Sequence, residues 1–288
     1  MTPAVDEVVN GRDVAALRAT RAEVAVLLPN SFASAWAVYR AGIPERWGYA
    51  TDMRATLLSR AVQRPAIRAH QAQYYRHLVH QLGVENGSLE PELTVPARAV
   101  DEARTLLGAR GWDQSRPLVV LAAGAAYGTA KRWPPQYFAQ MAATVVREQG
   151  AQCVLVGSTA DAETTGWVRS LVPEDVRPSV VDLAGATTLE TLAGVMSVAR
   201  ACVSNDSGAM HLAGAVGVPL VALFGPTRER ETAPLSRSGR RIEVLINHVW
   251  CRPCMLRECP LDHRCMKGLG PAKVVAAVTD LMSGDAAR

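Results

Sequence analysis

Short apolar runs alternate with helical stretches through the second half of the chain. The runs that we expect to be strands are residues 118–123, 152–156, 180–183, 201–204, 220–224 and 242–246, and the expected helices are residues 135–149, 160–171, 189–200 and 208–216. A continuous apolar run of this length is typical of a parallel strand that is buried on both faces. The alternation therefore predicts a doubly wound α/β domain around a parallel sheet.

Four turns follow the carboxyl ends of these expected strands. They comprise residues 124–131, 157–159, 205–208 and 225–227. Ligands of open α/β sheets bind outside the carboxyl ends of the strands. We therefore expect the four turns to line one crevice.

One of these turns leads directly from a strand into a helix of small residues, and residues 205–211 read NDSGAMH. The N–H groups at such a helix start and the positive end of the helix dipole favour an anion. Asp206 or Ser207 can cap the helix, Gly208 opens it, and His211 lies about one turn inside it. The alternative is an ordinary capped helix with a packed histidine.

The turn after the first expected strand contains glycines and two cations, Lys131 and Arg132. Glycine lets the backbone approach a phosphate closely, and a lysine supplies a mobile point charge. The spacing matches neither the Walker A pattern nor G-x-G-x-x-G. A solvated basic loop is the alternative, but together with residues 205–211 this turn suggests a ligand that carries a diphosphate.

The six cysteines fall into two groups. Cys153 and Cys202 lie in apolar expected strands and should be inert core residues. The other four lie close together in residues 251–265, with a histidine among them, and they are Cys251, Cys254, Cys259 and Cys265. In an intracellular chain this clustering favours a structural metal, zinc or an iron–sulfur cluster, over disulfides. Two alternatives to a metal are that the four thiols are reduced and structural, or that they form disulfides.

Charge and hydropathy exclude some classes of function. The net charge of +4 is too small to indicate nucleic-acid binding. The start of the chain does not resemble a signal peptide, and no apolar run approaches the roughly 18 residues of a transmembrane helix. We therefore expect a cytoplasmic protein. Five arginines in residues 228–241 form either a solvated loop or a contact with an anionic membrane surface or a phosphorylated acceptor.

The first part of the chain predicts a second region of strands and helices. Residues 23–28 read as a strand that ends at Asn30 and Ser31, and residues 34–41 and 71–82 read as helices. We place a domain boundary near residue 95, so that residues 1–95 form one domain. Residues 96–288 form the other domain, which includes the cysteine-rich segment 251–265 and a C-terminal helix.

Several segments together resemble a known family. They are Leu28-Pro29-Asn30-Ser31-Phe32, Ala41-Gly42-Ile43-Pro44, Lys131-Arg132-Trp133-Pro134, Asn205-Asp206-Ser207-Gly208, Phe224-Gly225-Pro226-Thr227 and the cysteine-rich segment. In this order they resemble glycosyltransferase family 9, the ADP-heptose:lipopolysaccharide heptosyltransferases, and most closely its heptosyltransferase II branch. The resemblance implies a GT-B type α/β fold, with two Rossmann-like domains of which the N-terminal one is incomplete here.

The resemblance also implies an activity. The chain would move L-glycero-D-manno-heptose from ADP-heptose onto the lipid A–Kdo inner core of lipopolysaccharide, with inversion and with no cofactor required for catalysis. It would act in the cytoplasm, at the cytoplasmic face of the inner membrane, with peripheral membrane contact and no nucleic-acid partner. The residues that would bind the donor are Lys131, Asp206, Ser207, Gly208, His211, Thr187, Ser158 and Asp161, and those on the acceptor side are Asn30 and Ser31.

In one respect the chain departs from the family pattern. The family carries its catalytic aspartate in a loop after a first strand, and no segment of this chain resembles that loop. The catalytic base is therefore unassigned, and Glu45 and Asp52 are the first carboxylates to consider. The alternative function is a catalytically inactive remnant that binds a nucleotide sugar but lacks the general base.

Overall fold

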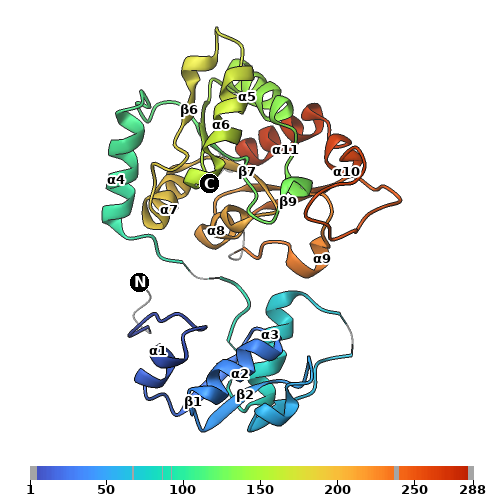
Figure 1. Ribbon diagram of the computed structural model, residues 1–288. Coiled ribbons are helices and arrows are strands. Elements are labelled where there is room, and N and C mark those ends of the chain that lie inside the picture. The colour runs from blue at the N-terminus through green and yellow to red at the C-terminus, as the bar shows by residue number, and fades with distance from the viewer. Residues whose placement is uncertain (1–4, 67, 86, 92, 237–239, 285–288) are drawn as a thin grey trace. The chain divides into compact units, whose positions relative to one another are not determined.

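The computed structural model describes residues 5–66, 68–85, 87–91, 93–236 and 240–284 (Figure 1). The chain divides into two compact units, unit 1 up to Leu89 and unit 2 from Glu90 onward. Within the described ranges, no helix has the length and apolar character needed to cross a membrane.

Unit 1 is built around three parallel strands in the order β1-β2-β3. Its elements are α1 (Val14–Ala19), β1 (Val24–Leu27), α2 (Phe32–Arg40), β2 (Glu45–Tyr49), η1 (Ala55–Leu57), β3 (Arg60–Val62) and α3 (Gln71–Gln81). One small core cluster gathers around Leu27 and Val38, and another joins Tyr49 to Leu78. The sequence pattern missed β3, because three residues are too few to show a strand period.

Unit 2 contains a sheet of six parallel strands. Its strands are β4 (Leu118–Ala122), β5 (Gln152–Leu155), β6 (Val180–Asp182), β7 (Ala201–Asn205), β8 (Leu220–Phe224) and β9 (Ile242–Ile246). Its helices are α4 (Ala97–Gly108), η2 (Thr129–Lys131), α5 (Pro135–Gln149), η3 (Thr159–Asp161), α6 (Ala162–Leu171), η4 (Arg177–Ser179), α7 (Leu189–Val198), α8 (Gly208–Val216), α9 (Glu229–Thr232), α10 (Arg264–Lys267) and α11 (Pro271–Gly284).

The strand order in this sheet is β6-β5-β4-β7-β8-β9. The order runs in one direction from β4 to β6 and in the other from β7 to β9, so the connections diverge between β4 and β7. Such a switch point leaves a crevice at the carboxyl ends of the two central strands. The fold therefore places the loop after β4 beside the loop after β7.

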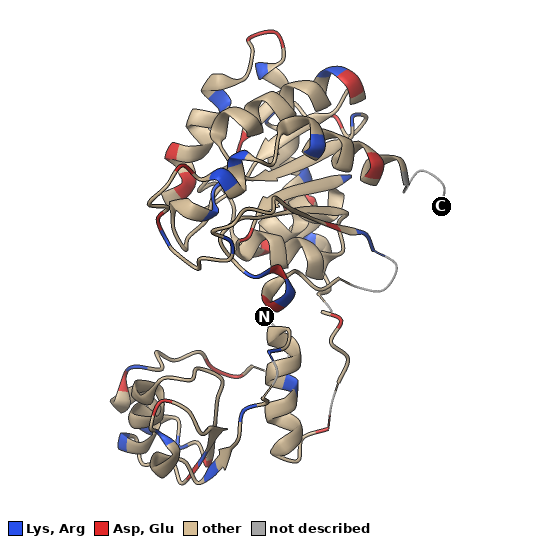
Figure 2. Cartoon of the chain, turned by 90° about the vertical axis from the view of Figure 1, so that its right-hand side faces the viewer, with Lys and Arg blue, Asp and Glu red and all other residues tan. Residues whose placement is uncertain are grey.

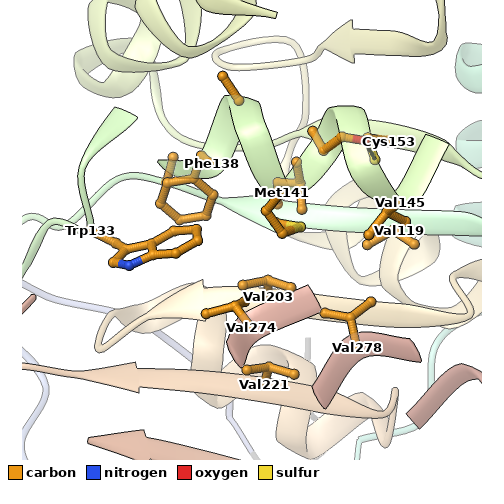
Figure 3. Packing of buried hydrophobic residues seen from close by; sticks show 14 of the residues in the cluster. Val119, Trp133, Phe138, Met141, Val145, Cys153, Val203, Val221, Val274 and Val278 are labelled. Atoms are coloured by element: carbon orange, nitrogen blue, oxygen red, sulfur yellow. Dashed lines mark hydrogen bonds between the residues drawn. The ribbon is translucent and has the colours of Figure 1, made fainter. Parts of the chain in front are cut away.

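Alternate residues of the central strands pack into separate cores on the two faces of the sheet. Val119 and Val203 face α5 and α11, where Phe138, Met141 and Val278 complete one core, as Figure 3 shows. The neighbouring residues in the strands face the other way, toward α4, α7 and α8. The strands β4, β5, β7 and β8 carry no Lys, Arg, Asp or Glu and are therefore drawn tan in Figure 2, which fits strands that are buried on both faces.

The expected strands of unit 2 are confirmed to within one residue at each end. Two expected helices have bounds that differ from those in the structure. The helix predicted at residues 160–171 begins with the 3-10 turn η3, and the one predicted at residues 189–200 ends at Val198. Ala199 adopts an extended conformation there, because the chain must straighten before β7 begins at Ala201.

Candidate active site

The loops after β4 and β7 are tied together by Asn205 and Trp133. The Asn205 side chain donates to the Ala123 carbonyl over 2.8 Å and accepts from the Trp133 backbone N–H over 3.0 Å. The Trp133 indole is 1% exposed and donates to the Leu269 carbonyl over 2.7 Å. Buried polar groups cost free energy unless they are paired, so these bonds fix the position of the whole Lys131–Pro134 loop. Sequence reasoning did not identify this role for Asn205.

Asp206 is the centre of a buried ionic cluster. Its Oδ2 lies 2.6 Å from the Lys131 Nζ and accepts from the Thr227 hydroxyl over 2.6 Å. Asp206 is 5% exposed, and the Lys131 side chain is 13% exposed. The Lys131 ammonium also lies over the Tyr127 ring, 4.7 Å from its centroid. Three of the four turns that were expected to line one crevice, those after β4, β7 and β8, therefore meet at the Asp206 carboxylate. The hydrogen bond from Thr227 was not predicted.

The start of α8 carries no side-chain cap. Ser207 occupies the N-cap position in an extended conformation, but its hydroxyl makes no capping bond and lies 3.3 Å from the Ser204 hydroxyl. The expectation that Asp206 or Ser207 caps this helix is wrong, because Asp206 is engaged by Lys131 and Thr227. The backbone N–H groups at the start of α8 therefore keep their capacity to bind an anion.

These groups surround a pocket of about 320 Å³. The residues that line it are Ala126, Tyr127, Lys131, Asp206, Ser207, Gly208, His211, Thr227, Arg228, Glu231, Thr232 and Met255. Five of the expected donor residues, Lys131, Asp206, Ser207, Gly208 and His211, thus come together in one place. Tyr127 belongs to the turn 124–131 that was expected to line the crevice. Met255 was not expected there, since nothing in the sequence brings the cysteine-rich segment to the loop after β4.

The cysteine-rich segment packs directly against the loop after β4. The Tyr127 hydroxyl donates to the Met255 carbonyl over 2.9 Å, and the Ala130 N–H donates to the Arg257 carbonyl over 3.0 Å. Gly128 has a φ of +150°, and a Cβ there would lie 2.2 Å from the Arg257 carbonyl oxygen. Only glycine fits this close approach, so the segment forms a wall of the pocket.

The other expected donor residues lie at the ends of neighbouring strands and do not line this pocket. Asp161 accepts from the Ser158 N–H over 2.9 Å and from its hydroxyl over 2.7 Å. A Cβ on Gly124 would lie 2.2 Å from the Asp161 Oδ1, so Asp161 also packs against the loop after β4. Thr187 lies in the loop between β6 and α7. The part of these three residues in donor binding stays a prediction.

In unit 1 the expected acceptor-side residues take part in local structure. The Asn30 side chain donates to the Tyr74 hydroxyl over 3.1 Å, and Ser31 caps α2. Arg54 is fully buried nearby, and its Nη1 donates to the Pro29 carbonyl. The Asn30 Oδ1 is buried without a hydrogen-bond partner. Polar contacts therefore hold the end of β1, and the part of Asn30 and Ser31 in acceptor binding stays a prediction.

The two carboxylates considered as alternative bases are both engaged. Hydrogen bonds donated by the Trp47 indole and the Ser59 hydroxyl lower the pKa of Glu45. The Asp52 Oδ2 accepts from the Phe32 N–H over 2.6 Å at the start of α2. A lowered pKa makes a carboxylate a weaker base. Glu45 is therefore poorly suited to accept a proton from an acceptor hydroxyl.

All six cysteines are free, which excludes the disulfide alternative in this structure. Burial raises the pKa of the Cys265 thiol, and the nearby Cys251, Cys259 and Cys254 raise it further, so the four sulfurs lie close enough to act on one another. Within the described ranges, however, no three His, Cys, Asp or Glu side chains are arranged to hold a metal ion. Cys153 and Cys202 are fully buried core residues, as expected.

The arginine-rich stretch 228–241 is only partly visible, because residues 237–239 lie outside the described ranges. Arg228 lies 3.7 Å from Glu231 and lines the pocket, and Arg241 pairs with Asp280. Arg252, from the cysteine-rich segment, pairs with Glu229 over 2.8 Å. Several charges of this stretch are therefore neutralised by partners within unit 2.

Comparison with known proteins places this geometry in a family. The model of glycosyltransferase family 9 (heptosyltransferase) matches residues 12–264. Lipopolysaccharide heptosyltransferase 2 of Salmonella typhimurium is 35% identical over 238 residues, which are 81% of this chain and 68% of that protein. Lipooligosaccharide heptosyltransferase 2 of Haemophilus influenzae is 33% identical over 229 residues, 77% of this chain and 66% of that protein.

Solved structures of heptosyltransferases have a similar fold. The structure of Escherichia coli ADP-heptose lps heptosyltransferase II superposes with a TM-score of 0.78 at 29% identity, over 95% of this chain and 80% of that one. Escherichia coli heptosyltransferase WaaC with ADP shares the fold, with a TM-score of 0.66 at 17% identity, over 93% of this chain and 75% of that one. These neighbours confirm the expected GT-B type fold class. The chain belongs to glycosyltransferase family 9, the heptosyltransferase family.

Proposed function

We propose that this chain transfers L-glycero-D-manno-heptose from ADP-heptose to the inner core of lipopolysaccharide. The observation that supports this most directly is the pocket in which Lys131, Asp206 and the uncapped start of α8 converge. A lysine and a helix N-terminus are two independent features that attract a diphosphate. The heptose and the lipopolysaccharide in this proposal come from the names of the relatives called heptosyltransferase 2.

In the proposed complex the donor diphosphate lies against the start of α8. The backbone N–H groups of Ser207 and Gly208 and the side chain of His211 would contact it, and Lys131 would turn from Asp206 toward it. Asp206 would then be available for the hydroxyls of the heptose. Adenine and ribose would extend toward Thr187, Ser158 and Asp161, at the ends of β6 and β5.

The reaction is a displacement at the anomeric carbon. The acceptor hydroxyl attacks from the face opposite to ADP, the new C–O bond forms as the bond to the diphosphate oxygen breaks, and ADP leaves with the electron pair, so the configuration inverts. Lys131 and the α8 dipole stabilise the negative charge on the departing ADP, and we propose that this charge needs no metal ion. A carboxylate base receives the hydroxyl proton, and we assign it to no residue of this chain.

The two units would have different roles. Unit 2 would hold the donor, while unit 1, with Asn30 and Ser31 at the end of β1, would bind the acceptor. Because lipid A is anchored in a bilayer, we propose that the protein works at the cytoplasmic face of the inner membrane. The five arginines of residues 228–241 would favour peripheral contact with that anionic surface.

Donor binding can be tested by calorimetry with ADP and ADP-heptose. Lys131→Ala should weaken binding of both by about 1–3 kcal/mol, the value of a hydrogen bond to a charged group. Lys273→Ala, which removes an exposed lysine of α11, is the matched control and should bind like the wild type. Equal affinity in Lys131→Ala and wild type would exclude this role for Lys131.

Transfer itself is tested by ADP release from ADP-heptose, with and without a heptosylated Kdo–lipid A acceptor. We expect release that depends on the acceptor and is slowed in Lys131→Ala. Tight donor binding without acceptor-dependent release would instead support the alternative of an inactive nucleotide-sugar-binding protein.

We also propose that the cysteine-rich segment binds one structural metal, zinc or an iron–sulfur cluster. The support is the clustering of Cys251, Cys254, Cys259 and Cys265 and the influence of three of these thiols on the fourth. As described, the thiols do not form a ligand set, so binding would have to draw them together. Elemental analysis of protein purified without chelator should find about one equivalent of zinc, or several of iron. Folded, active protein without metal would show that the thiols are simply reduced.

A further inference from the structure

A second pocket of about 410 Å³ lies in unit 2, apart from the one already described. It is lined by Thr129, Arg132, Pro134, Pro135, Gln136, Glu163, Thr164, Trp167, His263 and Lys267, none of which lines the first pocket. These residues come from the loop after β4, the start of α5, the outer side of α6, and α10. All of them belong to unit 2, so the pocket is complete within one compact unit of the chain.

The same loop serves both pockets. Lys131 lines the first pocket, and the next residue, Arg132, lines the second. Arg132 has an extended backbone, in which successive side chains point to opposite sides. The buried Trp133 that follows holds the loop in place through its bonds to Asn205 and Leu269. The two cations are therefore directed apart by a rigid backbone.

Arg132 is prepared to bind an anion. Its Nη1 donates to the Thr164 hydroxyl over 3.2 Å, while its Nε is buried and has no hydrogen-bond partner. The Nε is too enclosed for a ligand oxygen to reach it directly, so an anion would bind the Nη end of the guanidinium. Among the described residues, neither Arg132 nor Lys267 forms an ion pair. The guanidinium has the planar fork that matches a carboxylate or a phosphate, and Lys267 adds a second positive charge.

The remaining walls suit a sugar ring. Trp167 leaves 57% of its surface exposed, although a large indole is usually covered. The flat C–H face of a pyranose has no hydrogen-bonding groups, so it can pack on such an indole and gain dispersion energy. Gln136, Thr129 and Glu163 offer donors and acceptors around the rim for the ring hydroxyls. Pro134 and Pro135 close the apolar side.

We propose that this second pocket binds an acidic saccharide, a pyranose that carries a carboxylate or a phosphate. The acidic group would lie between Arg132 and Lys267, and the ring would stack on Trp167. This inference does not depend on the transfer reaction, because the donor pocket and this pocket share no lining residue.

The test is a titration of the full chain followed by the indole N–H signals of its tryptophans in ¹H–¹⁵N spectra, with Trp167→Phe identifying the signal of Trp167. The probes are methyl glucuronide, glucose 6-phosphate, the neutral methyl glucoside and inorganic phosphate. We expect both acidic sugars to shift the Trp167 signal and the neutral glucoside to shift it far less. A response of equal size to inorganic phosphate, or to the neutral glucoside, would overturn the proposal.

Variants separate this pocket from the donor pocket. Arg132→Gln should weaken acidic-sugar binding about tenfold or more, the loss expected for a charge-assisted hydrogen bond, while ADP affinity stays as in the wild type. Trp167→Ala, at an exposed position, should weaken the binding of both acidic sugars without changing the melting temperature of the protein. Lys131→Ala should show the reverse pattern, with ADP affinity lost and sugar binding kept. Unchanged sugar affinity in Arg132→Gln would refute the assignment, whatever the outcome of the donor experiments.

Discussion

Single hydrogen bonds determine how the pocket at the start of α8 is arranged, and the bond from Thr227 is an example. Its hydroxyl donates to the Asp206 carboxylate that also holds Lys131, and Thr227 is 4% exposed. Thr227→Val keeps the shape but removes the donor, so we expect the free energy of unfolding to fall by about 1–3 kcal/mol. Thr105→Val, which removes a hydroxyl bonded to the Asp101 carbonyl on an exposed helix face, should cost less than about 0.5 kcal/mol. Urea unfolding of the two variants measures the difference, and equal losses would contradict the role of Thr227.

Two core thiols make the stability sensitive to alkaline pH. Burial raises the pKa of Cys153 and of Cys202 from 9.0 to about 12. Above pH 9 the unfolded chain loses these protons while the folded chain keeps them, so the free energy of unfolding falls as pH rises toward 12. Between pH 8 and pH 10.5 the loss is about 2 kcal/mol per thiol, because one pKa unit corresponds to about 1.4 kcal/mol. The double variant Cys153→Ala with Cys202→Ala should lose correspondingly less stability in urea unfolding at the two pH values. If the free energy of unfolding falls equally in the variant and the wild type, other groups cause its dependence on alkaline pH.

Among the elements, the contact between the cysteine-rich segment and the loop after β4 depends on one glycine. Gly128→Ala would combine an unfavourable φ with a contact of 2.2 Å to the Arg257 carbonyl. We expect the segment to be displaced, the Met255 wall to be lost and ADP affinity to fall at least several-fold. Gly166→Ala is the matched control, because its Cβ meets nothing within 4 Å and alanine favours the interior of α6 by up to about 1 kcal/mol. Calorimetry and thermal unfolding of both variants test this, and wild-type affinity in Gly128→Ala would refute the contact's importance.

The elements that carry strong local signals were predictable from the sequence, and contacts between distant segments were not. Apolar runs gave the six strands of unit 2, and the residues 205–211 marked the start of α8. The contact of Met255 with Tyr127 joins positions 128 residues apart, and no local pattern encodes it. The same holds for the Thr227 bond to Asp206. The capping of α8 was predicted wrongly, because the pattern of an aspartate before a helix does not reveal that a lysine and a threonine already engage it.

At the scale of the whole molecule, the two units should differ in stability and in their response to the donor. Unit 1 has two small core clusters, and in the described residues β1 pairs only with β2 and leaves Val24 and Val26 more than 40% exposed. Unit 2 has a six-stranded sheet with a continuous core on each face. Because buried apolar area supplies most of the free energy of folding, local opening should cost less in unit 1.

Hydrogen exchange of the full chain, followed by mass spectrometry, measures this difference. We expect peptides from β1, β2 and β3 to exchange faster than those from β4, β5, β7 and β8. Saturating ADP should slow exchange in residues 124–134 and 205–216 and leave residues 24–62 unchanged, because every residue proposed to bind ADP lies in unit 2. Lys131→Ala serves as the control, in which the same ADP concentration should slow exchange less. Protection of residues 24–62 by ADP alone would show that unit 1 senses the nucleotide, and the donor site would then have to be extended beyond unit 2.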